Sequence, residues 1–189
     1  MTVGVLVLAA GRARRFGADK RQALLPDGQR VIDATLANIS ASGLPVLVCV
    51  AADDDALIQR LAAQTVASQR CQRAGEGMGA TLAEGIGHVQ HWRGVLVALA
   101  DMPWIVPATF RNVAEQLGDE RIVVPVYNGQ RGHPVGFARA FYPQLRALRG
   151  DAGARSVLIN YAADVVEVPV PDPAILRDID LPEDLPFCE

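Results

Sequence analysis

The length, composition and charge of the chain limit what it can be. Its 189 residues, 50% of them apolar, suffice for a sizeable core, so we expect a single domain over residues 1–189. No run approaches the ~20 apolar residues of a membrane span, and the N-terminus is typical of a strand rather than a signal peptide, so no membrane partner is expected. The net charge of −3 argues against nucleic acid as a partner. The three cysteines form neither a metal motif nor a disulfide framework, which favours a cytoplasmic location.

Apolar runs alternate with helix-like segments along the chain. We predict strands at 3–9, 45–50, 94–99, 122–126 and 165–168. We predict helices at 31–42, 54–64, 78–91, 107–117 and 152–161. Several of the strands are too apolar to be exposed on one face, so we expect a sheet that is covered on both sides. The alternation predicts a Rossmann-like α/β fold, with a mainly parallel, doubly wound sheet and helices on both faces.

The loop after the first strand combines small and basic residues. In open α/β sheets ligands bind beyond the carboxyl ends of the strands, and this loop begins at such a place, after Ala9. Small residues let backbone N–H groups approach a ligand, and the cations between Arg12 and Arg21 could neutralise a triphosphate. The loop lacks the spacing of a Walker A or a dinucleotide motif. A glycine turn with scattered surface arginines is therefore an equally good interpretation of these residues by themselves.

Two aspartates lie where a metal ion could be held. Asp101 comes after the apolar run 94–99, and Mg²⁺ prefers one or two carboxylates together with phosphate oxygens. The alternative is that Asp101 only caps the turn before Pro107. Asp180 precedes Leu181 and Pro182, a pattern typical of a helix N-cap with proline in the first turn. A capping carboxylate keeps a free oxygen, so a metal role for Asp180 stays open.

Three further segments combine glycine with polar side chains. Residues 129–137, which include His133, are typical of a hairpin connection whose basic side chains could bind an anion. Residues 75–82 are typical of a glycine-rich helix entry, and residues 148–155 contain an aspartate that could cap a helix.

These segments, in their order along the chain, resemble the MobA-like nucleotidyltransferases, which include molybdopterin cytidylyltransferases and guanylyltransferases. Residues 8–20 resemble the family signature Leu-Ala-Ala-Gly-x-Ser-x-Arg-Met/Phe-Gly-x-x-Lys, and residues 178–185 resemble its Asp-x-Asp-Thr-Pro-Glu-Asp-Leu ending. The Asp-Met-Pro at 101–103 and the Arg-Gly-His-Pro at 131–134 are similar to further family motifs. There are two departures from the pattern. Ala13 replaces the usual serine, and three residues rather than one separate Lys20 from the Leu-Leu-Pro at 24–26.

The resemblance implies roles for individual residues and a fold of the nucleotide-diphospho-sugar transferase type. The catalytic residues would be Arg15, Lys20 and Asp101. The nucleotide would be bound by Leu8, Ala9, Ala10, Gly11, Arg15, Lys20, Gly79 and Asp101. The acceptor would be bound by His133, Pro134 and Arg155, and Mg²⁺ by Asp101 and Asp180.

The resemblance also implies an activity: Mg²⁺-dependent transfer of CMP from CTP to the terminal phosphate of a molybdopterin cofactor, with release of pyrophosphate. The sequence Ala9-Ala10-Gly11 favours CTP, because the guanylyltransferases more often have Ala-Gly-Gly there. The implied partners are CTP (or GTP), a molybdopterin-type cofactor, and a molybdoenzyme or its chaperone. Two alternatives stay open. One is a guanylyltransferase, or a sugar- or alcohol-phosphate nucleotidyltransferase, of the same fold. The other is a non-catalytic module that delivers nucleotide or cofactor to a molybdoenzyme.

Overall fold

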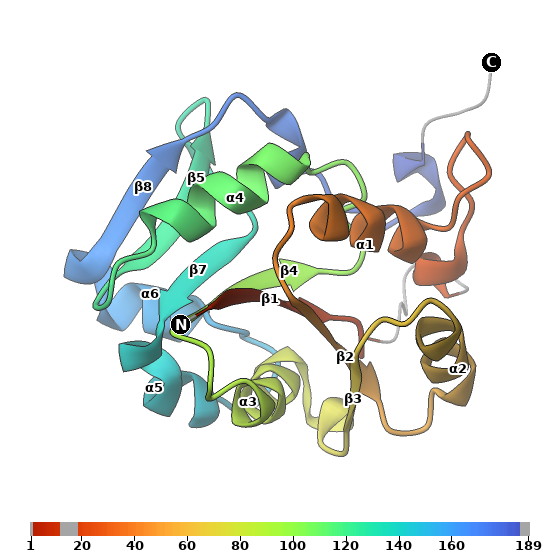
Figure 1. Ribbon diagram of the computed structural model, residues 1–189, viewed down its shortest axis with the longest axis horizontal. Coiled ribbons are helices and arrows are strands. Elements are labelled where there is room, and N and C mark those ends of the chain that lie inside the picture. Colours follow the sequence, from red (N-terminus) through yellow and green to blue (C-terminus); the bar gives the residue numbers. More distant parts are fainter. Residues whose placement is uncertain (1, 12–18, 186–189) are drawn as a thin grey trace.

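The apolar runs of the sequence become the strands of one sheet (Figure 1). The computed structural model describes residues 2–11 and 19–185. Within these residues the strands are β1 (Val3–Leu8), β2 (Val46–Ala51), β3 (Ser68–Cys71), β4 (Gly94–Leu99), β5 (Ile122–Tyr127), β6 (Gln130–Arg131), β7 (Val135–Ala138) and β8 (Val165–Pro169).

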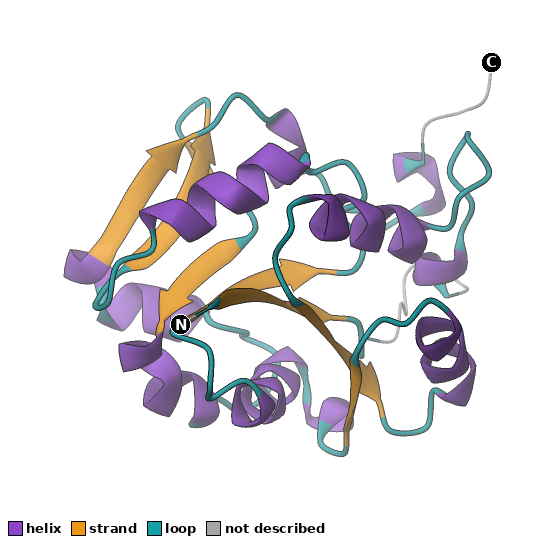
Figure 2. Ribbon diagram, in the orientation of Figure 1, coloured by secondary structure: helices purple, strands orange, loops and turns teal. Residues whose placement is uncertain are grey.

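The segments between the strands form helices that cover both faces of the sheet (Figure 2). Helices α1 and α4 lie on one side of the sheet, and α3 and α5 lie on the other (Figure 1). The helices are α1 (Val31–Ala41), α2 (Asp55–Ala63), α3 (Met78–His88), α4 (Pro107–Gln116), α5 (Tyr142–Arg146) and α6 (Arg155–Asn160). In the part of the chain that the structure describes, no helix is both long and apolar enough to cross a membrane.

The sheet is mixed but mainly parallel, with the strand order β3-β2-β1-β4-β7-β5-β6 and with β8 paired to β5. Strand β7 runs antiparallel to both of its neighbours, and β6 runs antiparallel to β5, while the other pairs are parallel. The side chains of β1 and β4 are almost all buried, because these two strands lie in the middle of the sheet. The predicted α/β class with helices on both faces is confirmed.

The short strands β3, β6 and β7 are not among the strands predicted from the sequence. Strand β3, Ser-Gln-Arg-Cys, carries a single apolar residue because it is an edge strand with little surface to bury. Strands β6 and β7 lie within the segment that is typical of a hairpin connection, but β7 is inserted between β4 and β5 and is fully buried. The expected helix at 152–161 begins only at Arg155, and the expected helix at 78–91 ends at His88.

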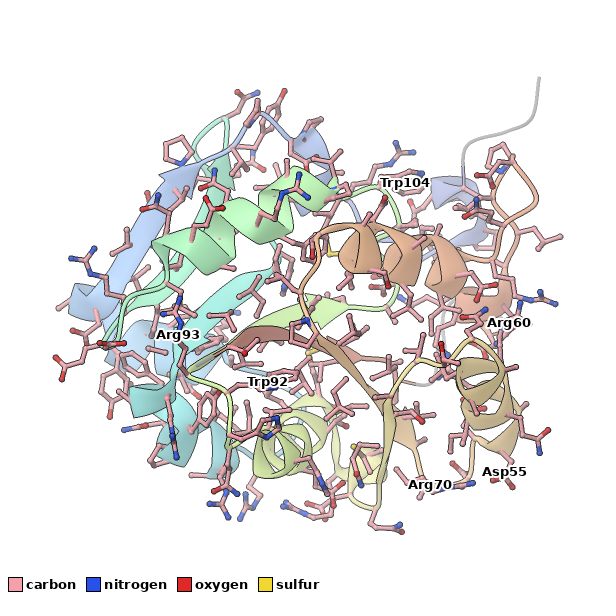
Figure 3. All side chains as sticks on the ribbon, viewed as in Figure 1. Asp55, Arg60, Arg70, Trp92, Arg93 and Trp104 are labelled. Atoms are coloured by element: carbon pink, nitrogen blue, oxygen red, sulfur yellow. The ribbon has the colours of Figure 1, made fainter. Side chains whose placement is uncertain are left out.

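Strand β1 contains a glycine, Gly4, against which the indole ring of Trp92 packs closely. A Cβ at Gly4 would lie 2.5 Å from ring atoms of Trp92, which precedes β4 (Figure 3). Real Cβ atoms do not approach other atoms this closely, so only glycine allows the indole to pack against the strand. This contact fixes the amino end of β1, opposite to the end where the site is found.

Candidate active site

A cleft of about 690 Å³ opens where β1, β2 and β4 end. Leu8, at the end of β1, is level with Cys49 in β2 and with Leu99 in β4, so the residues after these strands emerge at one edge of the sheet. The cleft lies at this edge, which is where ligands bind in open α/β sheets. Its walls come from residues 8–11, 20–21, 51–53, 71–72, 74–75, 77–78, 81 and 99–101, and from Asp151 and Asp180.

Most of the residues expected to bind nucleotide line this cleft, namely Leu8, Ala9, Ala10, Gly11, Lys20 and Asp101. Gly79 does not. Its N–H donates to the carbonyl of Gly150 at 2.7 Å, and it packs against backbone behind the wall that Gly77 and Met78 form. Arg15 lies outside the described residues.

The centre of the cleft is an ammonium group held by two carboxylates. Nζ of Lys20 lies 2.6 Å from Oδ2 of Asp101 and 2.7 Å from Oδ1 of Asp180. Burial alone would lower the pKa of Lys20, but its hydrogen bonds to Asp101 and Asp180 and their charges outweigh burial and raise it. Lys20 is therefore fully protonated at neutral pH. The two aspartates that the sequence assigned to a metal ion are brought together by the fold, with a lysine between them.

A third carboxylate, that of Asp178, joins this group and was not assigned from the sequence. Asp178 and Asp180 flank Ile179, whose side chain is fully buried and whose N–H donates to the carbonyl of Asp101 at 3.0 Å. In an extended segment alternate side chains point the same way, so burying Ile179 directs both aspartates to the opposite side. The Asp-x-Asp spacing around an apolar residue was the signal that could have found Asp178.

The three carboxylates have the chemistry of a divalent metal site. Oxygen atoms of Asp101, Asp178 and Asp180 lie within 4.8 Å of one another. Oδ1 of Asp101 is buried, and among the residues that the structure describes no group donates a hydrogen bond to it. Burial raises the pKa of the Asp178 carboxyl, and the charges of Asp101 and Asp180 raise it further. Oxygen ligands that repel one another, one of them buried and without a hydrogen-bond partner among the described residues, fit a hard cation such as Mg²⁺ or Mn²⁺.

The capping roles considered for these aspartates are wrong. The one-turn 3₁₀ helix η6 (Pro182–Asp184) has Leu181 at its N-cap, and the Asp184 carboxylate accepts from the backbone N–H groups of Asp180 and Leu181. The N-cap of α4 is Val106, and near it the Asp172 carboxylate accepts from the N–H of Val106 and the hydroxyl of Thr109. Asp180 is therefore not the N-cap of η6, and the carboxylates of Asp101 and Asp180 both contact Lys20.

Arg21 lines the cleft, but its guanidinium is held by neighbouring protein groups. It belongs to the short helix η1 (Lys20–Gln22), and its guanidinium pairs with Asp19 at 2.8 Å and with Asp54 at 2.6 Å. It also donates to the carbonyl of Ala9. Arg21 thus ties the segment that carries Lys20 to the end of β1 and to the N-terminus of α2.

Replacing Arg21 by glutamine is expected to lower the free energy of unfolding by about 2 kcal/mol, because charged hydrogen bonds to partly buried carboxylates are lost. Urea unfolding measures this change. Arg131→Gln is the matched control: its ion pair with Glu167 is half exposed, and its removal should cost less than about 0.5 kcal/mol. Equal losses in the two variants would contradict the structural role of Arg21.

Part of the cleft wall, at Gly77, is backbone in close contact with a neighbouring segment. Gly77 has φ +120°, and a Cβ there would lie 2.3 Å from Oδ1 of Asp151 and 2.5 Å from the carbonyl carbon of Gly150. Only glycine meets both demands. The glycine-rich helix entry is thus a packing contact between the start of α3 and the 149–151 segment, and Asp151 is not the N-cap of α6, which is Ala154.

The residues expected to bind the acceptor are not on the described cleft walls. His133 lies mostly buried beyond β6, with its backbone N–H donating to the carbonyl of Ile175 at 3.0 Å, and Pro134 is buried. Burial lowers the pKa of His133, although a hydrogen bond to the Val97 backbone and the charges of Asp101 and Asp178 oppose this effect. Within the described residues its Nδ1 has no hydrogen-bond partner. Arg155 is exposed at the start of α6.

Comparison with known proteins agrees with this fold. The chain is 29% identical over 195 residues to the purine catabolism protein PucB of Bacillus subtilis, covering 96% of this chain and 93% of PucB. The crystal structure of Rv0371c from Mycobacterium tuberculosis superposes with a TM-score of 0.85 at 26% identity, covering 97% of this chain and 94% of that one. A structure of the same protein in complex with manganese gives 0.79 at 25% identity, over 97% and 96% of the two chains.

A more distant structure, the molybdopterin-guanine dinucleotide biosynthesis protein A of Archaeoglobus fulgidus, shares the fold with a TM-score of 0.70 at 20% identity, over 96% of this chain and 94% of that one. Fold and cleft together define a nucleotidyltransferase of the nucleotide-diphospho-sugar transferase type. The model of the MobA-like NTP transferase domain matches residues 5–165, and the chain belongs to that family.

Proposed function

We propose that the protein transfers CMP from CTP to the terminal phosphate of a molybdopterin-type cofactor and releases pyrophosphate. The observation that carries the proposal is the group of Lys20, Asp101 and Asp180 in a cleft at the ends of β1 and β4. A cation beside clustered carboxylates suits a metal-bound triphosphate, since phosphoryl transfer depends on positioning and charge neutralisation more than on acid–base chemistry.

Each part of the cleft has a role in this proposal. Residues 8–11 present small side chains and backbone to the nucleoside, and Lys20 contacts the phosphates that leave as pyrophosphate. Arg15 is proposed to help Lys20. Asp101 and Asp180, with Asp178 beside them, would hold Mg²⁺, which when bound neutralises charge at the α-phosphorus. An oxygen of the acceptor phosphate attacks that phosphorus, and the bond to the β-phosphate oxygen breaks. The acceptor phosphate is already ionised at neutral pH, so no general base is required.

The proposal also specifies which nucleobase is used and which residues bind the acceptor. Ala9-Ala10-Gly11 supports CTP, because a methyl group close to the base crowds a purine. The acceptor is proposed to be bound by His133, Pro134 and Arg155. Because these residues do not line the described cleft walls, either they must rearrange or the acceptor must approach from outside those walls. The product would pass to a molybdoenzyme or its chaperone. A reducing cytoplasm suits Cys49 and Cys71, which are free thiols.

The test is an assay with Mg²⁺, molybdopterin cofactor and each nucleoside triphosphate in turn, in which pyrophosphate release is measured. We expect release with CTP that depends on both the acceptor and the metal. Faster release with GTP would replace the choice of CTP by the guanylyltransferase alternative, which the name of the Archaeoglobus fulgidus neighbour favours. Tight CTP binding with no pyrophosphate release under any of these conditions would indicate a binding module.

A further inference from the structure

Lys20 occupies the position where the carboxylate pair would hold a metal ion. Its ammonium lies between Oδ2 of Asp101 and Oδ1 of Asp180, at 2.6 and 2.7 Å, and its side chain is 17% exposed. Both carboxylates belong to the group whose spacing suits a divalent cation. Lys20 and a metal ion would thus bind the same pair of carboxylates.

It is electrostatically unfavourable for the Lys20 ammonium and a divalent metal ion to occupy this carboxylate pair at the same time. A metal–oxygen bond of about 2.1 Å would place a divalent ion within about 4 Å of the ammonium, where like charges repel strongly in a partly buried site. We propose that Lys20 and a divalent metal ion are mutually exclusive occupants of the Asp101–Asp180 pair, so that Lys20 must leave both carboxylates before the metal can bind them.

This exclusion gives the site an order of assembly, which rests on the proposed function. A triphosphate offers Lys20 new anionic partners, so binding of the nucleotide draws the ammonium away and opens the carboxylate pair. By linkage, the metal then strengthens nucleotide binding by the same factor as the nucleotide strengthens metal binding. The free protein would hold its metal weakly, and Lys20 would keep the carboxylates neutralised meanwhile.

A competing arrangement would leave Lys20 in place. The metal could bind Asp178 and Oδ1 of Asp101, to which no described group donates a hydrogen bond, while the ammonium kept its present contacts. The two arrangements differ in what happens to Lys20, and the sequence makes this measurable. Lys20 is the single lysine among the 18 lysine and arginine residues of the chain, so a reagent selective for lysine reports on this side chain.

The first measurement is Mn²⁺ affinity of the protein without nucleotide, from the electron paramagnetic resonance signal of free Mn²⁺. Lys20→Met removes the charge and keeps the length of the stem, and we expect it to bind Mn²⁺ at least about 10-fold more tightly than the unmodified protein. Lys20→Arg keeps the charge and should stay within about 2-fold of the unmodified protein. Unchanged affinity in Lys20→Met, or equally tight binding by Lys20→Arg, would overturn the proposal.

The second measurement uses the unmodified protein and so does not depend on the folding of a variant. The acetylation rate of Lys20, followed by peptide mass spectrometry, should be slow without metal and should rise with saturating Mg²⁺ toward the rate of an exposed lysine. An acetylation rate that saturating Mg²⁺ leaves unchanged would support the arrangement in which Lys20 keeps its contacts with Asp101 and Asp180, and would overturn the proposal. Neither measurement includes nucleotide or turnover, so a failure of the proposed transferase activity would be seen separately.

Discussion

Replacing Asp101 by asparagine is expected to reduce pyrophosphate release by roughly 10³-fold and to leave the fold intact. Asparagine has the shape of aspartate but lacks its charge and has only one oxygen. The NH₂ group must therefore replace either the oxygen that pairs with Lys20 or the buried oxygen that no described group satisfies, and the metal site loses a negative charge in both cases. The measurement is the rate of pyrophosphate release at saturating CTP and Mg²⁺, together with thermal unfolding.

The matched control for Asp101→Asn is the same chemical change at Asp55. That residue is the first of α2 and pairs with Arg70 on the surface, where its side chain is 68% exposed (Figure 3). Asp55→Asn should leave turnover within about 2-fold, because exposed ion pairs contribute little. If Asp101→Asn stayed as active as this control while folded, Asp101 would have no part in the mechanism.

Replacing Gly77 by alanine is expected to lower the free energy of unfolding by about 3 kcal/mol, since strain and steric overlap act together. The backbone at φ +120° disfavours any side chain, and the added Cβ would overlap Asp151 and the backbone of Gly150. Relief of the overlap must push the start of α3 away from the 149–151 segment, which would also reshape the cleft wall. Urea unfolding and CTP affinity measure the two effects.

A glycine near the other end of α3 serves as the control for Gly77→Ala. Gly87 lies in α3, has ordinary helical geometry, and an added Cβ there would meet no atom within 4 Å. Gly87→Ala should raise the free energy of unfolding by about 0.5–1 kcal/mol through helix propensity. A Gly77→Ala variant as stable as Gly87→Ala would mean that the start of α3 moves freely against its neighbour.

Most of the sheet could be predicted because burial on both faces leaves a strong signal in the sequence. The apolar runs of β1 and β4 are continuous for this reason. Strand β3 leaves no such signal at the edge of the sheet, and β7 is too short to be distinguished from a hairpin arm. Its insertion between β4 and β5 depends on pairings between segments that are far apart in the chain.

For the site, the sequence by itself determined which side chains stand at the end of each strand. Asp101 comes after one apolar run and Ala9 to Gly11 come at the end of another, so local pattern alone placed these groups at the edge of a sheet. The flanking of Ile179 by two aspartates was also present in the sequence, but the role of Asp178 became clear only from the structure. Only the tertiary structure decided their partners. The hydrogen bond from Lys20 to Asp180 spans 160 positions in the chain, and Arg21 reaches Asp54 across 33. Such pairings result from strand order and from which carboxylates are left facing a partly buried cation, and no spacing in the sequence encodes them.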